Sequence, residues 1–127
     1  GPAYVFHMVE ACLPLLSHSA DGRIVNVSSF MGSLALQSTS SEPAIVPAYQ
    51  ASKTALNSIT VTLAAALADS GIRVVSVDPG FVQTDFSPIN HSLAPLTADQ
   101  GAEPIVRAAQ GDLVTGTFVG RDGPTPW

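Results

Sequence analysis

Two short β-branched runs, separated by a long helical pattern, restrict what this chain can fold into. The runs are RIVNVS (23–28) and IRVVSVD (72–78), and the second stops abruptly at Pro79 and Gly80. Runs of this kind are typical of strands buried on both faces of a parallel sheet, so we expect 23–28 to be a central strand. Residues 48–68 place Ala, Leu, Ile and Val every three or four positions, which predicts a long helix between the strands.

The remaining segments extend this alternation of helices and strands. Residues 3–16 are nearly all apolar and predict a buried helix, with Pro14 bending or ending its last turn. Thr97 and Gln100 form a capping-box pattern that predicts a helix ending near residue 109, and 113–119 predicts a weaker last strand. Helices and strands in alternation indicate a single α/β domain, 1–127, with a parallel sheet. We expect residues 29–47 to form a long loop, 79–96 an irregular stretch, and the last seven residues a tail.

Composition excludes several classes of function. The 127 residues are 46% hydrophobic, enough for a core, and five Lys and Arg against ten Asp and Glu give a net charge of −5. That charge argues against nucleic acid or an anionic membrane as partner. No apolar stretch reaches the roughly 18 residues of a membrane span. Cys12 is the single cysteine, which indicates a reduced, cytoplasmic setting, and no histidine has a partner at metal-ligand spacing, so we expect no metal.

Polar side chains follow both predicted strands, where a parallel sheet collects its ligands. Ser29 ends the first run and DPGFVQT (78–84) ends the second, so both fall on one edge of the sheet. Tyr49 and Lys53 lie four residues apart, on one face of the predicted helix. A phenol with an ordinary pKa near 10 exchanges protons poorly at neutral pH, but a nearby ammonium favours the phenolate and lowers that pKa. With a serine hydroxyl to hold the substrate oxygen, these groups predict hydride chemistry on a carbonyl or alcohol.

Each of these features also has an ordinary structural explanation. A tyrosine and lysine four apart can be a solvated helix face, Ser28 and Ser29 can terminate a strand, and Pro79 with Gly80 is a common strand stop. Their joint order and spacing favour the catalytic interpretation.

The same order of motifs resembles the C-terminal half of a short-chain dehydrogenase/reductase, of the carbonyl reductase-like kind. The motifs are GRIVNVSS, YQASKTALN, GIRVVSVDPGFVQTDF, the helix at 100–109 and the closing TGTFVGRDGPTPW. The resemblance covers almost the whole chain. It implies part of a doubly wound, Rossmann-like parallel sheet, and an NAD(P)-dependent oxidoreductase acting on a small carbonyl or alcohol substrate.

The resemblance also assigns roles to particular residues. Ser29 would orient the substrate carbonyl with support from Ser28, Tyr49 would be the general acid and base, and Lys53 would bind the nicotinamide ribose. Four residues would line the nicotinamide: Pro79, Gly80, Val82 and Thr84. Twenty positions separate Ser29 from Tyr49, more than is usual in the family, and the added loop 32–47 is expected to form part of the wall of the substrate pocket.

The chain departs from the family in its length. Members are roughly twice as long and begin with a glycine-rich turn that holds the dinucleotide pyrophosphate at a helix N-terminus, and this chain, which opens at GPAYVF, contains no such turn. We therefore expect a partial domain that is inactive alone, with an exposed strand edge that makes it marginally stable or self-associating, and a possible homo-oligomer. The cofactor is expected to be NADP or NAD, with NADP favoured slightly by the carbonyl reductase resemblance.

Two other classes of function remain open. A truncated chain could keep the three residues as remnants and serve as a non-catalytic binding or scaffold fragment. A serine hydrolase is the weaker alternative, because no G-x-S-x-G motif occurs and Ser29 is followed by bulky Phe30 and Met31.

Overall fold

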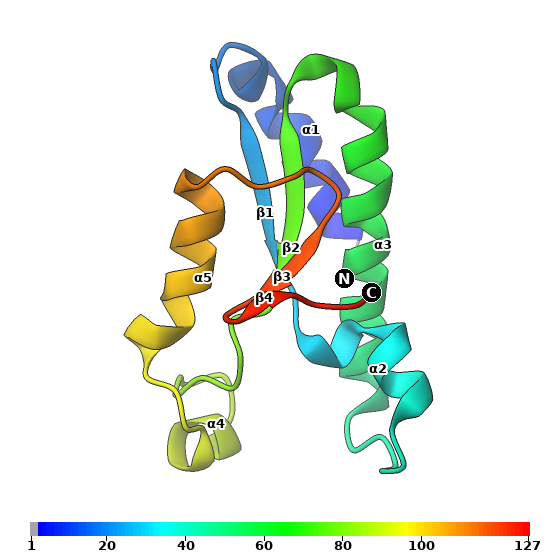
Figure 1. The fold of residues 1–127 in the computed structure, drawn as a ribbon, viewed down its shortest axis with the longest axis vertical. Helices are drawn as coiled ribbons and strands as arrows, with labels where there is room; N and C mark the ends of the chain where they lie inside the picture. The colour runs from blue at the N-terminus through cyan, green and yellow to red at the C-terminus, as the bar shows by residue number, and fades with distance from the viewer. Residues whose placement is uncertain (1–2) are drawn as a thin grey trace.

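A computed structural model describes residues 3–127 as a four-stranded sheet with helices on both faces (Figure 1). The elements in chain order are α1 (Ala3–Ser17), β1 (Arg23–Val27), the 3-10 turn η1 (Phe30–Gly32), α2 (Leu34–Thr39), α3 (Pro47–Ala66), the 3-10 turn η2 (Ala68–Ser70), β2 (Arg73–Val77), α4 (Pro88–Leu93), α5 (Ala98–Gln110), β3 (Phe118–Gly120) and β4 (Gly123–Pro124). The expected α/β class is confirmed. The sheet is mixed, because β4 pairs antiparallel with β3.

The valine-rich strand β2 lies inside the sheet, between β1 and β3. It pairs in parallel with β1 over five residues, from Arg23 opposite Arg73 to Val27 opposite Val77, and in parallel with β3. The prediction of a central strand at 23–28 is wrong for the described residues, where β1 is the edge strand. A β-branched run indicates a strand, but its place in the sheet depends on which other strands pair with it.

Side chains that alternate along β2 divide the core between the two faces of the sheet. Val74 is fully buried and packs with residues of α1 and α3, among them Val9 and Leu63. Val77 points to the opposite face and packs with Ala108 of α5. Helices α1 and α3 therefore cover one face and α5 the other, as Figure 1 shows.

Helix α1 is largely exposed, and the prediction of a buried helix is wrong. Tyr4 is 67% exposed and Leu15 77%, and Val9 is the one residue of the helix classed as buried. Pro14 lies inside the helix, which continues to Ser17. An apolar sequence indicates that a segment gains from being buried, but it is buried only if another part of the protein covers it.

Two segments expected to be irregular contain short helices. Residues 29–47 include η1 and α2, and Ser33 caps α2 by accepting a hydrogen bond from the amide of Leu36 at 3.1 Å. In the stretch 79–96, Ser87 caps α4 in the same way. A serine before each segment is the available signal, but six-residue helices are too short to show a helical period.

The other elements lie close to their predicted places. Helix α3 begins at Pro47 and ends two residues earlier than expected. The capping box of α5 is confirmed, with Thr97 and Gln100 exchanging both hydrogen bonds. The last parallel strand, β3, is shorter than the predicted 113–119, and the expected tail supplies β4.

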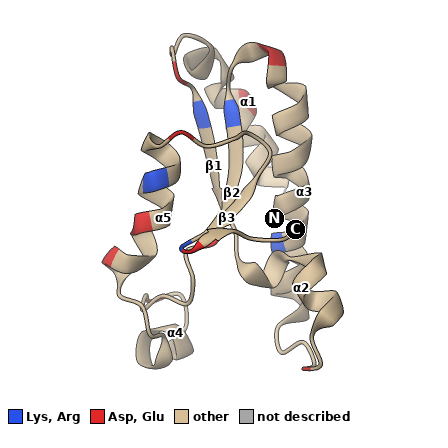
Figure 2. Ribbon diagram, in the orientation of Figure 1, with Lys and Arg blue, Asp and Glu red and all other residues tan. Residues whose placement is uncertain are grey.

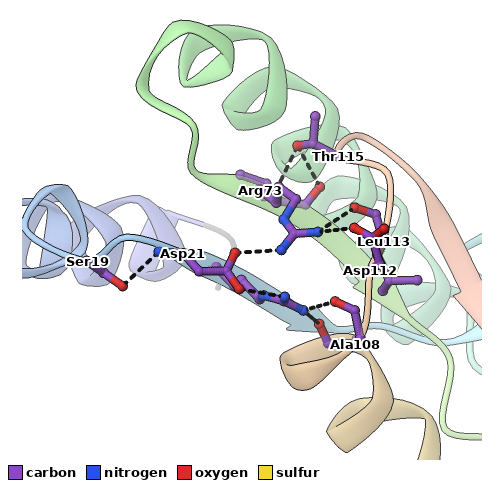
Figure 3. Close-up of polar contacts among 10 residues, drawn as sticks. Ser19, Asp21, Arg73, Ala108, Asp112, Leu113 and Thr115 are labelled. Carbon is purple, nitrogen blue, oxygen red and sulfur yellow. Dashed lines mark hydrogen bonds and ion pairs between the residues drawn. The ribbon is translucent and has the colours of Figure 1, made fainter.

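A network of ion pairs joins the amino ends of β1 and β2 (Figure 3). The Asp21 carboxylate accepts hydrogen bonds from Arg23 at 2.7 Å and Arg73 at 2.5 Å, and Arg73 also pairs with Asp112 at 3.0 Å. Arg23 donates to the Ala108 carbonyl at 3.1 Å, near the C-terminus of α5. The two guanidinium groups, Arg23 first, lower the pKa of Asp21 to about 2. Figure 2 shows a basic position on β1 and one on β2 at the same end of the sheet. The bond from Arg23 to Ala108 connects this end to α5.

Candidate active site

The carboxyl ends of β1 and β2 lie side by side at the end of the sheet opposite the ion-pair network. The amide of Ser28 donates to the carbonyl of Val77 at 2.7 Å, which continues the parallel pairing one residue beyond β1. Ser29 and Pro79 each follow two residues after the last pair of this register, Val27 opposite Val77. The structure therefore places the two predicted ligand-binding segments at one edge.

The two serines after β1 have different environments. The hydroxyl of buried Ser28 donates to the side-chain oxygen of buried Asn57, on α3, at 2.6 Å. The Ser29 hydroxyl, also buried, accepts a hydrogen bond from the amide of Met31 at 3.1 Å and so starts η1. Because a hydroxyl both accepts and donates, that bond leaves the Ser29 hydrogen free for an acceptor such as a substrate oxygen.

Lys53 lies one helical turn after Tyr49 on α3, as their spacing predicts, and its ammonium reaches the end of β1. Its Nζ donates to the carbonyl of Val27 at 3.0 Å and lies 5.6 Å from the centroid of the Tyr49 ring. The side chain is half-buried, and burial lowers the pKa of the Lys53 ammonium. A positive charge is thus held between the strand end and the tyrosine.

Tyr49 also contacts the segment that follows β2. Its ring lies 5.9 Å from the ring of Phe86, between centroids, with the planes tilted by 56°. This contact brings the polypeptide after Thr84 to the start of α3. Sequence reasoning missed Phe86, because nothing in the local pattern links it to Tyr49.

Gly32 is a second residue that sequence reasoning missed. It is buried in η1, and a Cβ built on it would lie 2.8 Å from the carbonyl carbon and the Cβ of Lys53. The turn that begins at Ser29 therefore touches the backbone of α3 at the residue that carries the ammonium. A side chain of any size would separate them.

The four residues predicted to line the nicotinamide occupy different environments. Pro79 and Gly80 lie directly at the end of β2, and Gly80 has a φ of +86° with its amide bonded to the Asp78 carboxylate at 3.0 Å. Val82 forms an isolated bridge with Leu96 and contacts α5. Thr84 is exposed, and its hydroxyl accepts from the amide of Phe86 at 3.3 Å. The contacts of Val82 thus lead toward α5 and not toward Tyr49.

A groove of about 370 Å³ lies between η1, the segment 36–45 and the start of α3. Its lining includes Phe30 and Met31, which follow Ser29, and Gln50, which follows Tyr49. The rest of the lining comes from the predicted pocket wall: Leu36, Gln37, Ser40, Glu42, Pro43, Ala44 and Ile45. A more open hollow of about 550 Å³ is lined by α5 alone. Neither lining includes Ser29, Tyr49 or Lys53, but the groove is lined by residues that neighbour Ser29 and Tyr49 in the chain.

A family model confirms the resemblance suggested by the motifs. The model described as short chain dehydrogenase matches residues 4–92, which is more than half of the chain. This chain belongs to the short-chain dehydrogenase family. The matched residues include Ser29, Tyr49 and Lys53.

Individual short-chain dehydrogenases show the same likeness. Short-chain dehydrogenase anuI of Penicillium roqueforti is 40% identical over 109 residues, which are 80% of this chain and 42% of that protein. Carbonyl reductase Sniffer of D. melanogaster has a TM-score of 0.75 and 33% identity over 94% of this chain and 51% of its own. The NADPH-bound carbonyl reductase from chicken fatty liver has a TM-score of 0.76 and 25% identity, with the same coverage. The chain thus spans about half the length of these two solved carbonyl reductases.

Within the described residues 3–127, no histidine contacts Ser29. His18 bonds the carbonyl of Pro14 within α1, and His91 lies 3.3 Å from Asp85. In this part of the chain, the serine–histidine pair that many serine hydrolases use is therefore not seen at Ser29.

Two further properties concern only residues 3–127. They include no group of three or more His, Cys, Asp or Glu side chains placed to hold a metal ion. None of their helices has both the length and the apolar character needed to cross a bilayer.

Proposed function

We propose that this chain is the catalytic half of a nicotinamide-dependent carbonyl reductase or alcohol dehydrogenase. The observation that carries the proposal is the position of the Lys53 ammonium, which bonds the Val27 carbonyl at 3.0 Å and lies over the Tyr49 ring. This places a cation beside a phenol ring at the carboxyl end of a parallel strand, where Ser29 follows two residues after Val27. Ligands of open α/β sheets bind at such edges.

The residues at this edge fit the nicotinamide end of the cofactor. An ammonium has three donors, and Lys53 uses one on Val27, which leaves two for the hydroxyls of a ribose. Pro79 and Gly80, at the end of β2, would lie against the nicotinamide, which accepts or supplies a hydride when bound. NADP is favoured over NAD because two similar solved proteins, from chicken fatty liver and Burkholderia multivorans, have NADPH or NADP bound.

Three side chains of this chain would act on the substrate. In reduction, the Ser29 hydroxyl donates a hydrogen bond to the carbonyl oxygen and orients it. As the carbonyl carbon gains a hydride, its oxygen takes the proton of the Tyr49 hydroxyl, and the product is an alcohol. The positive charge of Lys53 stabilises the tyrosinate that remains, and the reverse steps oxidise an alcohol.

The decisive experiment replaces Tyr49 in the longer polypeptide that we propose contains this chain. Tyr49→Phe keeps the ring and its contact with Phe86 but removes the proton donor. We expect carbonyl reduction to fall about 10²- to 10⁴-fold, the usual contribution of a general acid. Tyr4→Phe on α1, 67% exposed, is the matched control and should leave the rate unchanged. Unchanged reduction in Tyr49→Phe would exclude the proposal and favour the scaffold alternative.

The isolated chain should bind the dinucleotide weakly and be inactive, because its sequence contains no glycine-rich turn for the pyrophosphate. Isothermal titration with NADPH and NADH measures this directly. Micromolar affinity for either cofactor would contradict the expectation of a partial site.

A further inference from the structure

The groove that is lined by Phe30 and Gln50, the residues that follow Ser29 and Tyr49 in the chain, has mainly apolar walls. Phe30 is 47% exposed and Leu36 41%, and both line the groove together with Met31 and Ile45. Exposed apolar side chains gathered around a hollow next to a reactive centre are typical of a substrate pocket. The walls therefore favour a substrate with an apolar body.

The shape of the groove is fixed by hydrogen bonds between its own segments. The Gln37 side-chain amide donates to the Met31 carbonyl at 2.6 Å and approaches the Thr54 hydroxyl at 3.4 Å. The Thr54 hydroxyl in turn donates to the Gly32 carbonyl at 2.9 Å. Helix α2 is thus held against η1 and α3, and the groove is largely formed before a ligand enters.

One charged residue lines this groove, and its charge is negative. Glu42 is exposed in the loop after α2, and the lining contains no lysine or arginine. In Figure 2, α2 and this loop are uncharged apart from that acidic position. Among residues 3–127, Glu42 takes part in none of the ion pairs. Its carboxylate is therefore available to a ligand.

We propose that the groove selects an apolar ketone that carries a positive charge, such as an amine or quaternary ammonium. This inference rests on the proposed function, since the carbonyl would reach Ser29 and Tyr49 while the charged end stays near Glu42. The carboxylate attracts a cation, and the exposed Phe30 ring adds a second favourable surface for it. A carboxylate or phosphate on the substrate would meet Glu42 and a chain of net charge −5.

Three ketones of matched shape test this assignment on the chain itself. The probes are para-acetylbenzyltrimethylammonium, its neutral isostere para-neopentylacetophenone, and the anion para-acetylphenylacetate. Amide shifts of Phe30, Ile45 and Gln50 in nuclear magnetic resonance titrations report binding in the groove. We expect the cation to bind about fivefold more tightly than the isostere, as one exposed charge pair allows, and the anion most weakly.

Two variants connect this preference to the groove. Glu42→Gln should remove the preference for the cation, whereas Glu10→Gln, the same change on α1, should keep it. Ile45→Lys, at a position that is 88% exposed, should weaken the preference for the cation, because the added ammonium offsets the Glu42 carboxylate. Equal binding of the three ketones, no binding of the cation, or a preference that survives Glu42→Gln would each overturn the assignment.

These titrations involve no hydride transfer, so their failure is distinct from that of the proposed function. Equal binding would refute the charge selection and leave reduction by Tyr49 intact. If Tyr49→Phe kept the full rate of carbonyl reduction, the proposed function would be refuted, but the affinities measured for the three ketones would still stand.

Discussion

A methyl group on Gly32 would lie 2.8 Å from the backbone of Lys53. The turn that begins at Ser29 is therefore in direct contact with α3 at the residue that carries the ammonium. This contact limits the distance between the turn and the part of α3 that carries Lys53, although Gly32 itself has no side chain to take part in the chemistry.

Gly32→Ala should destabilise the chain and displace the candidate site. The added methyl must push η1 away from α3, and overpacking of this kind costs about 1–3 kcal/mol of unfolding free energy. Urea unfolding measures the loss, and the amide resonances of Ser29 and Lys53 report the displacement. Gly71→Ala is the control: its φ of +76° adds strain, but the space around it is open and the site should not move. An unchanged midpoint with unchanged resonances in Gly32→Ala would show that the contact is not a constraint.

Replacing Ser28 should mainly lower the stability of the chain, whereas replacing Ser29 should mainly lower the rate of carbonyl reduction. Ser28→Ala removes the partner of the buried Asn57 oxygen, which costs about 1–3 kcal/mol. Ser29→Ala removes a cap of η1, which costs about 1 kcal/mol, but should abolish carbonyl reduction in the longer polypeptide. Chemical unfolding and initial rates on both variants give the comparison. If Ser28→Ala lost more activity than Ser29→Ala at equal stability, the roles of the two serines would have to be exchanged.

Stability should fall in acid because of Asp21. Its folded-state pKa of about 2 lies below the ordinary value of 3.8, so its contribution is fully present above about pH 4 and is lost as the pH falls toward 2. Unfolding measured between pH 5 and 2 should show this loss, reduced by salt because the pair is exposed. Asp21→Asn should flatten the profile, and Asp69→Asn, an exposed residue of η2, should not. A profile unaffected by Asp21→Asn would mean that the network contributes nothing to stability.

The isolated chain should associate through α1 and the free edge of β1. Tyr4 and Leu15 of α1 are exposed, and β1 has an unpaired edge in the described sheet. Leu15→Lys should weaken association about tenfold, the value of burying one leucine, as measured by sedimentation velocity over a range of concentrations. Leu93→Lys is the matched control, since Leu93 is 70% exposed but lies on α4. A monomer with a sharp, concentration-independent melting transition would refute this expectation.

The order of the catalytic candidates could be predicted from the sequence because each depends on a local pattern. Strand runs and their stops place Ser29 and Pro79 at strand ends, and a spacing of four places Tyr49 and Lys53 on one helix face. The parallel register then brings the two strand ends together. The roles of these residues in catalysis remain predictions.

The α/β class, the capping box of α5 and the strands β1 and β2 could be predicted from local patterns, because helical period, β-branched runs and caps are properties of neighbouring residues. Other features are visible only in the folded chain: within the described residues β1 is an edge strand, α1 is exposed, Gly32 contacts Lys53 and Phe86 packs on Tyr49. These features join residues distant in the chain, and burial depends on which surface covers another. A local sequence pattern therefore does not predict which distant residues come into contact.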